Sequence, residues 1–216
     1  MSIPPRLATD AELPRRVAEC LKKGDRGRTQ EARLAPQLTY GRHAGPRPYT
    51  ARSAAVLLLL FQRNGRWHLP LTERPLSLAH HGGQMSLPGG AIDAGETASV
   101  AAVRELREEL GVASEVELLG PLADCYVFAS DYSIAPWVAA AYDEPTWRPH
   151  AGEVQSVIEL PIDALLDDDA IGRLTIERGP LVFHAPCFRF GEARIWGATS
   201  MILSEFAGVL RNCAAT

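Results

Sequence analysis

The sequence predicts a mixed α/β fold in which a β-sheet lies between helices. Strand-like apolar segments occur before, between and after several helical segments along the 216 residues. This order favours a mixed sheet that is covered by helices. The length suits one domain with a substantial core. We expect that domain at residues 51–216, after an N-terminal helix and an irregular extension at residues 1–50.

The first elements follow from helix, strand and turn signals. Asp10–Lys23 predicts a helix with Asp10 as its cap, Pro14 in its first turn and Gly24 as its stop. Ala54–Phe61 is apolar on both faces, which predicts a buried central strand. Asn64-Gly65 predicts a tight hairpin into a second strand, Trp67–Thr72.

The later elements are shorter. Pro161 suits the start of a helix, and Pro136 is expected to interrupt its strand. We expect strands at Val116–Leu119, Cys125–Phe128, Ile134–Tyr142 and Val154–Leu160, a short helix at Ile162–Leu166, a hairpin of Leu181–His184 with Phe188–Phe190, and a final helix at Ala198–Leu210.

The stretch Gly90–Val112 joins a glycine loop to a charged helix. Thr97 is the expected N-cap and Gly111 the expected stop. At about 100° per residue, apolar side chains gather on one side and three glutamates on roughly the opposite side. These are Val100, Val103, Leu106 and Leu110 against Glu105, Glu108 and Glu109. Clustered carboxylates repel one another unless a cation lies among them, and Mg²⁺ or Mn²⁺ prefers such oxygen ligands.

A charged helix face is usually only solvated. Here, however, nine positions carry fixed residue types at set spacings: Gly90, Glu96 and Arg104-Glu105-Leu106-x-Glu108-Glu109-x-Gly111-Val112. A chance match is below about one in 10⁸ per starting position at ordinary residue usage. The pattern resembles the Nudix box, which implies an α/β/α sandwich and a loop–helix–loop that binds divalent metals and cleaves a diphosphate linked to another moiety.

The resemblance also implies roles for single residues. Metal ligands would be Glu105, Glu108, Glu109 and the Gly90 carbonyl, with Mg²⁺ or Mn²⁺ as cofactor. Glu96 and Arg104 would form a structural pair. Gly152-Glu153-Val154 resembles a loop that presents a further acidic residue to the metals. Catalysis would rest on Glu105, Glu108 and Glu153, and either Glu108 or Glu153 would be the general base.

A second motif lies upstream of the box. Leu71–Arg74 and His81–Gly90 resemble the signature of the coenzyme A diphosphatase branch of Nudix hydrolases. That signature is L-L-T-x-R-[SA], followed by R, G and F-P-G-G, with three residues between each part and the next. Pro75, Ala79 and Leu87 depart from it, and Ala79 replaces an arginine. His80, His81 or an upstream arginine could supply that charge. The implied substrate contacts are Arg74, His81, Gly83 and Gln84.

The function implied by this branch is hydrolysis of coenzyme A or acyl-CoA to 3′,5′-ADP and (acyl-)4′-phosphopantetheine. Pro75 and Ala79 leave open a Nudix diphosphatase for another nucleoside diphosphate derivative, such as ADP-ribose, NADH or a diadenosine polyphosphate. A third hypothesis is that the protein is a non-catalytic nucleotide-binding module. The intact glutamate set disfavours it, because a binding module has no need of a costly carboxylate cluster.

Composition bounds the partners and the compartment. The net charge of −4 gives no basic excess, so we expect no nucleic-acid surface. A small nucleotide-type substrate is what the Nudix resemblance implies. The longest apolar run, Ala54–Phe61, is too short to span a membrane. Four scattered cysteines without a CxxC pair indicate reduced thiols in a cytoplasmic protein. The sequence alone leaves open whether the N-terminal helix closes the active site or makes a homodimer contact.

Overall fold

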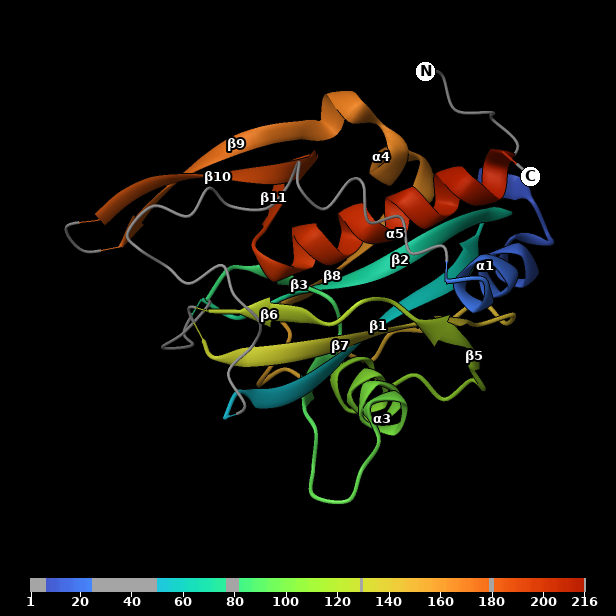
Figure 1. Ribbon diagram of the computed structural model, residues 1–216, viewed down its shortest axis with the longest axis horizontal. Coiled ribbons are helices and arrows are strands. Elements are labelled where there is room, and N and C mark those ends of the chain that lie inside the picture. The colour runs from blue at the N-terminus through green and yellow to red at the C-terminus, as the bar shows by residue number, and fades with distance from the viewer. Residues whose placement is uncertain (1–6, 25–49, 77–81, 129, 179–180, 216) are drawn as a thin grey trace.

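Helices cover both faces of a central sheet in this protein (Figure 1). Helices α1 (Leu13–Lys22) and α5 (Ala198–Ala215) lie over one face, and α3 (Ala98–Leu110) lies over the other. The predicted mixed sheet between helices is confirmed. The computed structural model describes residues 7–24, 50–76, 82–128, 130–178 and 181–215.

The main sheet is built around strand β1 (Arg52–Arg63). It pairs antiparallel with β2 (Arg66–Glu73) and with the short β4 (Gly89–Ala91), and parallel with β7 (Tyr132–Ala140). Among the described residues, four more strands extend the sheet from β2 and β7. These are β3 (Met85–Ser86) and β8 (Ser156–Pro161) beside β2, and β5 (Glu117–Pro121) and β6 (Cys125–Val127) beside β7.

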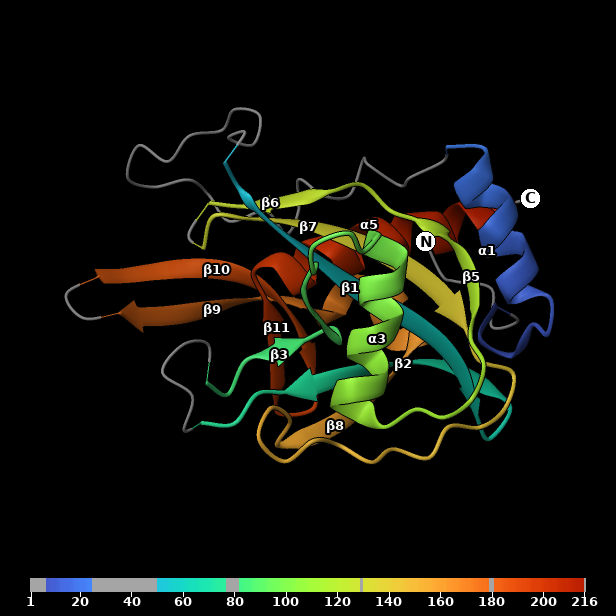
Figure 2. The ribbon, with the colours of Figure 1, turned by 90° about the horizontal axis from the view of Figure 1, so that it is seen from below.

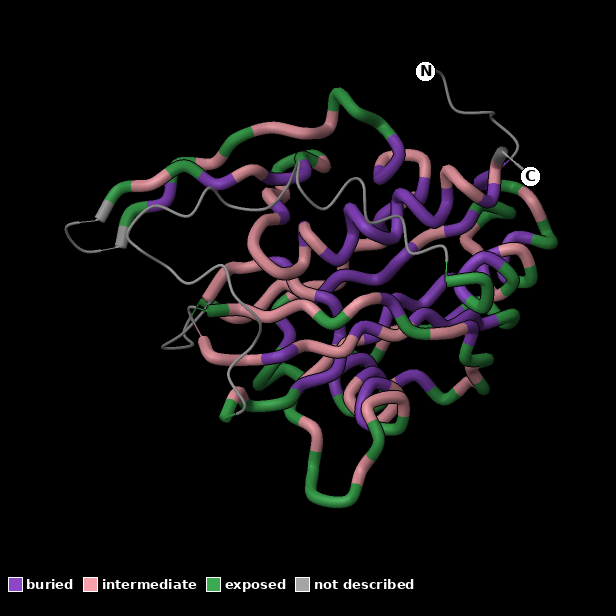
Figure 3. Tube along the Cα trace, in the orientation of Figure 1, coloured by how far each residue is buried: buried purple, intermediate pink, exposed green. Residues whose placement is uncertain are grey.

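Strand β1 is buried on both faces, as its apolar sequence predicts. Successive side chains of a strand point to opposite faces. Leu58 and Leu60 therefore pack toward α1 and α5, while Leu57, Leu59 and Phe61 pack toward α3. All five are fully buried, and Figure 3 shows the buried segments concentrated along the central strands and the helix sides that face them.

The Asn64-Gly65 hairpin is confirmed, but Pro136 does not interrupt its strand. Pro136 lies inside the continuous β7, opposite Val56 of β1. Its carbonyl accepts a hydrogen bond from Leu122 N–H at 2.9 Å, so the proline nitrogen faces the gap between the end of β5 and the start of β6. A proline lacks only the N–H donor. The missing donor falls at this change of partner strand, so the sheet tolerates it.

The predicted hairpin at Leu181–His184 and Phe188–Phe190 is wrong. Both segments belong to one strand, β10 (Leu181–Phe190), which pairs with β9 (Ile171–Arg178) and β11 (Ala193–Trp196) in a separate three-stranded sheet. The sequence of β9 carries a signal for this, because Leu174 and Ile176 alternate with polar residues. Such alternation is typical of a half-buried strand.

Helix α1 is part of the core rather than a separate arm. Leu13 and Val17 are fully buried, and Trp67 Nε1 donates to the Asp10 carbonyl at 2.8 Å just before the helix. Asp10 is not the N-cap, because the helix begins at Leu13 and the Asp10 carboxylate accepts from Glu12 N–H instead. Most of the predicted irregular segment before residue 51 falls outside the described residues. In the described ranges, no helix is long and apolar enough to cross a membrane.

Candidate active site

Helix α3 carries the candidate site, and its two ends follow from local chemistry. Thr97 has extended backbone angles, and its hydroxyl accepts a hydrogen bond from Val100 N–H at 3.4 Å. Gly111 adopts a left-handed conformation, with φ of 63°, and donates to the Arg107 carbonyl. Glycine takes that conformation without steric cost. Thr97 and Gly111 are therefore the N-cap and the C-terminal stop of α3, as predicted.

The face that α3 buries differs from the prediction. Val100 is 56% exposed, whereas Glu109 is only 3% exposed. Two alanines turn this side of the helix toward the sheet, so the buried arc includes carboxylates. At about 100° per residue, the arc runs through Ala101, Glu105, Glu109, Ala102, Leu106 and Leu110.

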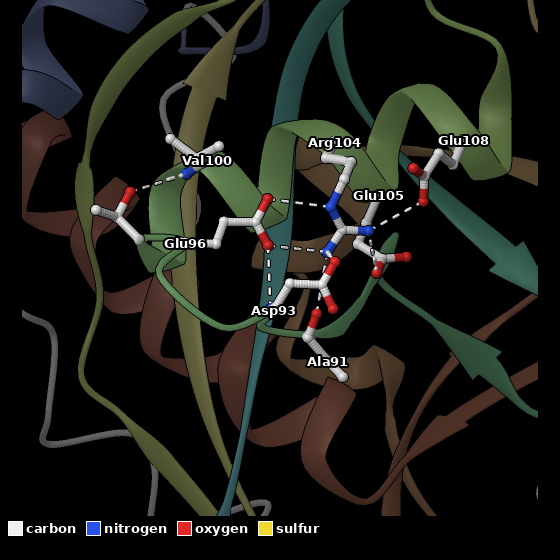
Figure 4. Close-up of polar contacts among 8 residues, drawn as sticks. Ala91, Asp93, Glu96, Val100, Arg104, Glu105 and Glu108 are labelled. Carbon is white, nitrogen blue, oxygen red and sulfur yellow. Dashed lines mark hydrogen bonds and ion pairs between the residues drawn. The ribbon is translucent and has the colours of Figure 1, made fainter.

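Arg104 links the loop before α3 to the helix carboxylates (Figure 4). Its Nε and Nη2 donate to the two oxygens of Glu96, each at 3.0 Å. Its Nη1 donates to Glu105 at 2.8 Å and to Glu108 at 3.0 Å, and Nη2 also reaches the Ala91 carbonyl. These bonds lower the pKa of Glu96 and raise the pKa of Arg104. The structure thus joins Glu96, Arg104, Glu105 and Glu108 in one network.

Glu105 and Glu109 lie beside the glycine strand β4. A Cβ atom on Gly90 would lie 2.3 Å from Glu105 Oε1, so only glycine lets this carboxylate approach the backbone so closely. Burial raises the pKa of Glu105, and it raises the pKa of Glu109 to about 8, with the Glu105 charge adding to the effect. Glu109 Oε2 is buried and has no hydrogen-bond partner among the described residues.

A loop bound to the C-terminal end of α3 brings Glu153 to this site. Arg148 N–H donates to the Leu110 carbonyl and His150 N–H donates to the Glu109 carbonyl, both at 2.8 Å. Glu153 N–H in turn donates to the His150 carbonyl at 3.0 Å. The negative charge of Glu153 contributes to the raised pKa of Glu109.

The same loop is fixed at two further points that the sequence does not predict. Trp147 Nε1 donates to Glu159 at 2.6 Å, and Arg63 Nε donates to the other oxygen of Glu159 at 3.0 Å. Gln155 N–H donates to the Glu73 carbonyl at 2.8 Å, next to Arg74. These contacts join segments that are far apart in the chain, so no local sequence signal announces them.

The upstream motif forms the open end of the β2–β3 pair. Arg74 N–H donates to the Gln84 carbonyl at 3.1 Å, and Gly83 N–H donates to the Arg74 carbonyl at 2.9 Å. Arg74 Nε is buried without a hydrogen-bond partner in the described part of the chain. Burial raises the pKa of Glu109 overall, and the Arg74 charge partly opposes this rise. His81, together with Ala79 and His80, lies outside the described residues.

The donor set fits a hard divalent cation, which prefers oxygen ligands. Two carboxylates with raised pKa values lie beside strand β4, Glu105 at Gly90 and Glu109 at Gly89, and Glu109 Oε2 lacks a hydrogen-bond partner among the described residues. Within the described ranges, no three acidic, histidine or cysteine side chains are arranged to hold a metal ion as they stand. If Glu105 and Glu108 bound a cation, their carboxylates would give up the hydrogen bonds from Arg104.

Several carboxylates are thus held on one helix beside a glycine strand. The chain belongs to the Nudix family: the family model described as NUDIX domain matches residues 51–178. The protein is therefore a hydrolase of a family whose members use divalent cations and act on small nucleotide derivatives.

Two relatives of similar sequence agree with this assignment. The chain is 30% identical over 170 residues to Nudix hydrolase 3 of Caenorhabditis elegans, which covers 70% of each chain. It is 30% identical over 176 residues to the Nudix hydrolase NudL of Salmonella dublin, covering 81% of this chain and 88% of that one. Among solved structures it is similar to RenU, a Nudix hydrolase of M. smegmatis, at 26% identity and a TM-score of 0.45, covering 52% and 72% of the two chains.

Proposed function

We propose that the protein hydrolyses the diphosphate of coenzyme A or acyl-CoA, giving 3′,5′-ADP and (acyl-)4′-phosphopantetheine, with Mg²⁺ or Mn²⁺ as cofactor. The observation that carries the proposal is the upstream motif, in which Leu71–Arg74, Gly83 and Pro88–Gly90 match the coenzyme A diphosphatase signature in register. A cytoplasmic location belongs to the proposal and rests on the cysteine spacing alone.

The position of Arg74 supports a phosphate-binding role. A guanidinium is a natural partner of phosphate oxygens, because it can donate two parallel hydrogen bonds. Arg74 Nε has no partner in the described residues, and the Arg74 charge acts on Glu109. Arg74 would therefore contact the diphosphate beside the cation, with Gly83 and Gln84 lining the same segment and His81 as a further proposed contact.

The acidic residues would divide the remaining tasks. Glu105, Glu108, Glu109 and the Gly90 carbonyl would hold the cation. When bound, the cation neutralises phosphate charge and lowers the pKa of a water ligand. Glu108 or Glu153 would accept the proton of the attacking water. Glu96 would keep Arg104 in place and thereby position the loop before α3.

Pro75 and Ala79 favour a second candidate, a Nudix diphosphatase for ADP-ribose, NADH or a diadenosine polyphosphate. The loss of an arginine at residue 79 removes a charge that the coenzyme A signature contains. A non-catalytic nucleotide-binding module is the third candidate. It would bind nucleotides without turnover, whatever divalent cation is supplied.

A substrate comparison tests the proposal. The full chain is assayed with coenzyme A, acetyl-CoA, ADP-ribose, NADH and diadenosine tetraphosphate at equal concentrations with Mg²⁺ and then Mn²⁺. We expect the highest kcat/KM for coenzyme A or its acyl derivative. A higher kcat/KM for one of the other compounds would overturn the coenzyme A assignment. Hydrolysis of none of them would favour the binding module.

A further inference from the structure

Two cysteines from opposite ends of the chain meet in the core. Cys20 lies in α1 and Cys213 lies in the last turns of α5, 193 positions later. Cys213 Sγ donates to Cys20 Sγ at 2.9 Å and also contacts the Arg16 carbonyl at 3.6 Å. Figures 1 and 2 both show α1 beside the C-terminal end of α5.

We propose that Cys20 and Cys213 form a site of reversible oxidation, at which a disulfide joins the first helix of the chain to the last. A disulfide bond is about 2.05 Å long, so the two sulfurs need to approach by less than about 1 Å. The helices that carry them already pack against each other through buried side chains such as Val17. The two thiols are therefore already in contact in the reduced protein.

The exposure of the two thiols suits a small oxidant. Cys20 is 8% exposed and Cys213 is 1% exposed, so Cys20 is the thiol that an oxidant reaches first. With hydrogen peroxide, Cys20 Sγ attacks one oxygen, the O–O bond breaks, and water and a sulfenic acid result. Cys213 Sγ then attacks the sulfenic sulfur, the S–O bond breaks, and a second water leaves with the thiol proton. Two thiols and one peroxide thus give one disulfide and two waters.

We expect this bond to raise the thermal stability of the protein without changing catalysis. The disulfide would close a loop that contains the whole main sheet, and cross-links over long loops restrict the unfolded chain most. The candidate active site lies on the opposite face of that sheet, at α3 (Figure 1). Oxidation should therefore raise thermal stability and leave turnover at moderate temperature unchanged.

Disulfide mapping of the wild-type protein tests the proposal without any substitution. Reduced protein is treated with hydrogen peroxide, remaining thiols are alkylated, and a non-reducing digest is analysed by mass spectrometry. We expect one linked peptide pair that contains Cys20 and Cys213, and a Tm increase of about 5–10 °C that dithiothreitol reverses. Recovery of the two cysteines on separate peptides after this treatment would overturn the proposal.

Matched variants locate the effect. Cys20→Ser should lose both the linked peptides and the gain in Tm on oxidation. Cys125→Ser, which changes a partly buried cysteine of β6, should keep both. A gain in Tm that survives in Cys20→Ser would show that another reaction stabilises the oxidised protein, and the proposal would be wrong.

Discussion

Arg104 and Glu96 form a two-pronged ion pair in which Nε and Nη2 each donate to a different carboxylate oxygen at 3.0 Å. The same guanidinium reaches Glu105 and Glu108 through Nη1. The Arg104 guanidinium therefore connects the loop before α3 to two carboxylates of the candidate site. The pair explains how a short glycine-containing loop holds a defined position next to the helix.

Glu96→Gln tests this relationship. The substitution removes the charge of the pair but keeps the shape of the side chain, so the fold should persist while Arg104 becomes less well positioned. Loss of such a supporting partner usually costs about 10–100-fold in metal affinity or activity. We expect a kcat/KM reduction in that range, whereas Glu19→Gln, which breaks an exposed Arg–Glu pair in α1, should have no effect. Unchanged kinetics in Glu96→Gln would contradict the positioning role.

Glu108→Gln and Glu153→Gln distinguish the two candidates for the general base. We expect Glu108→Gln to lower kcat by at least about 10², the usual scale for loss of a key catalytic group, with the fold intact by circular dichroism. A larger loss in Glu153→Gln than in Glu108→Gln would assign the base to Glu153. Near-wild-type turnover of Glu108→Gln at saturating Mg²⁺ would rule out a catalytic role for Glu108.

Glu109→Gln separates metal binding from folding. The carboxylate is buried and Oε2 has no hydrogen-bond partner in the described residues, so its removal should not lower the Tm of the metal-free protein. Affinity for Mn²⁺, measured by isothermal titration calorimetry, should fall by at least about 10-fold. The exposed Glu115→Gln serves as control. Wild-type Mn²⁺ affinity in Glu109→Gln would exclude this residue from the metal site.

Glu159 should make stability depend on pH. Hydrogen bonds from Arg63 hold the pKa of Glu159 below its ordinary value of 4.5. The stabilisation is therefore complete above pH 4.5 and is lost as the pH falls through the lowered pKa of the folded state. Glu159→Gln should reduce the free energy of unfolding at neutral pH by about 1–3 kcal/mol. In urea unfolding, the difference from wild type should shrink in acid; a difference that is the same at every pH would contradict the account.

The sequence predicts those features whose chemistry is local. Thr97 and Gly111 mark the ends of α3 because capping depends on a few neighbouring atoms. Asn64 and Gly65 mark the hairpin because both adopt positive φ, of 52° and 71°. The central strand is equally clear, since its residues are apolar on both faces. In each case a short stretch of sequence contains all the groups that determine the structure.

Features that depend on tertiary packing were not predictable in the same way. The helical periodicity of α3 is correct, but which arc faces the sheet depends on how closely two alanines let the helix approach. Glu109 is consequently buried and Val100 exposed, the reverse of the expectation. The bonds of Glu159 with Trp147 and Arg63, and the contact of Cys20 with Cys213, join distant segments and leave no trace in local sequence patterns.

The most direct test of the central claim is incubation of the purified full chain with coenzyme A and Mg²⁺ or Mn²⁺, with products identified by chromatography and mass spectrometry. We predict metal-dependent release of 3′,5′-ADP and 4′-phosphopantetheine in equal amounts, and no release by Glu108→Gln on the same time scale. Intact coenzyme A after incubation, in a sample whose Mn²⁺ binding has been demonstrated, would contradict the proposed substrate.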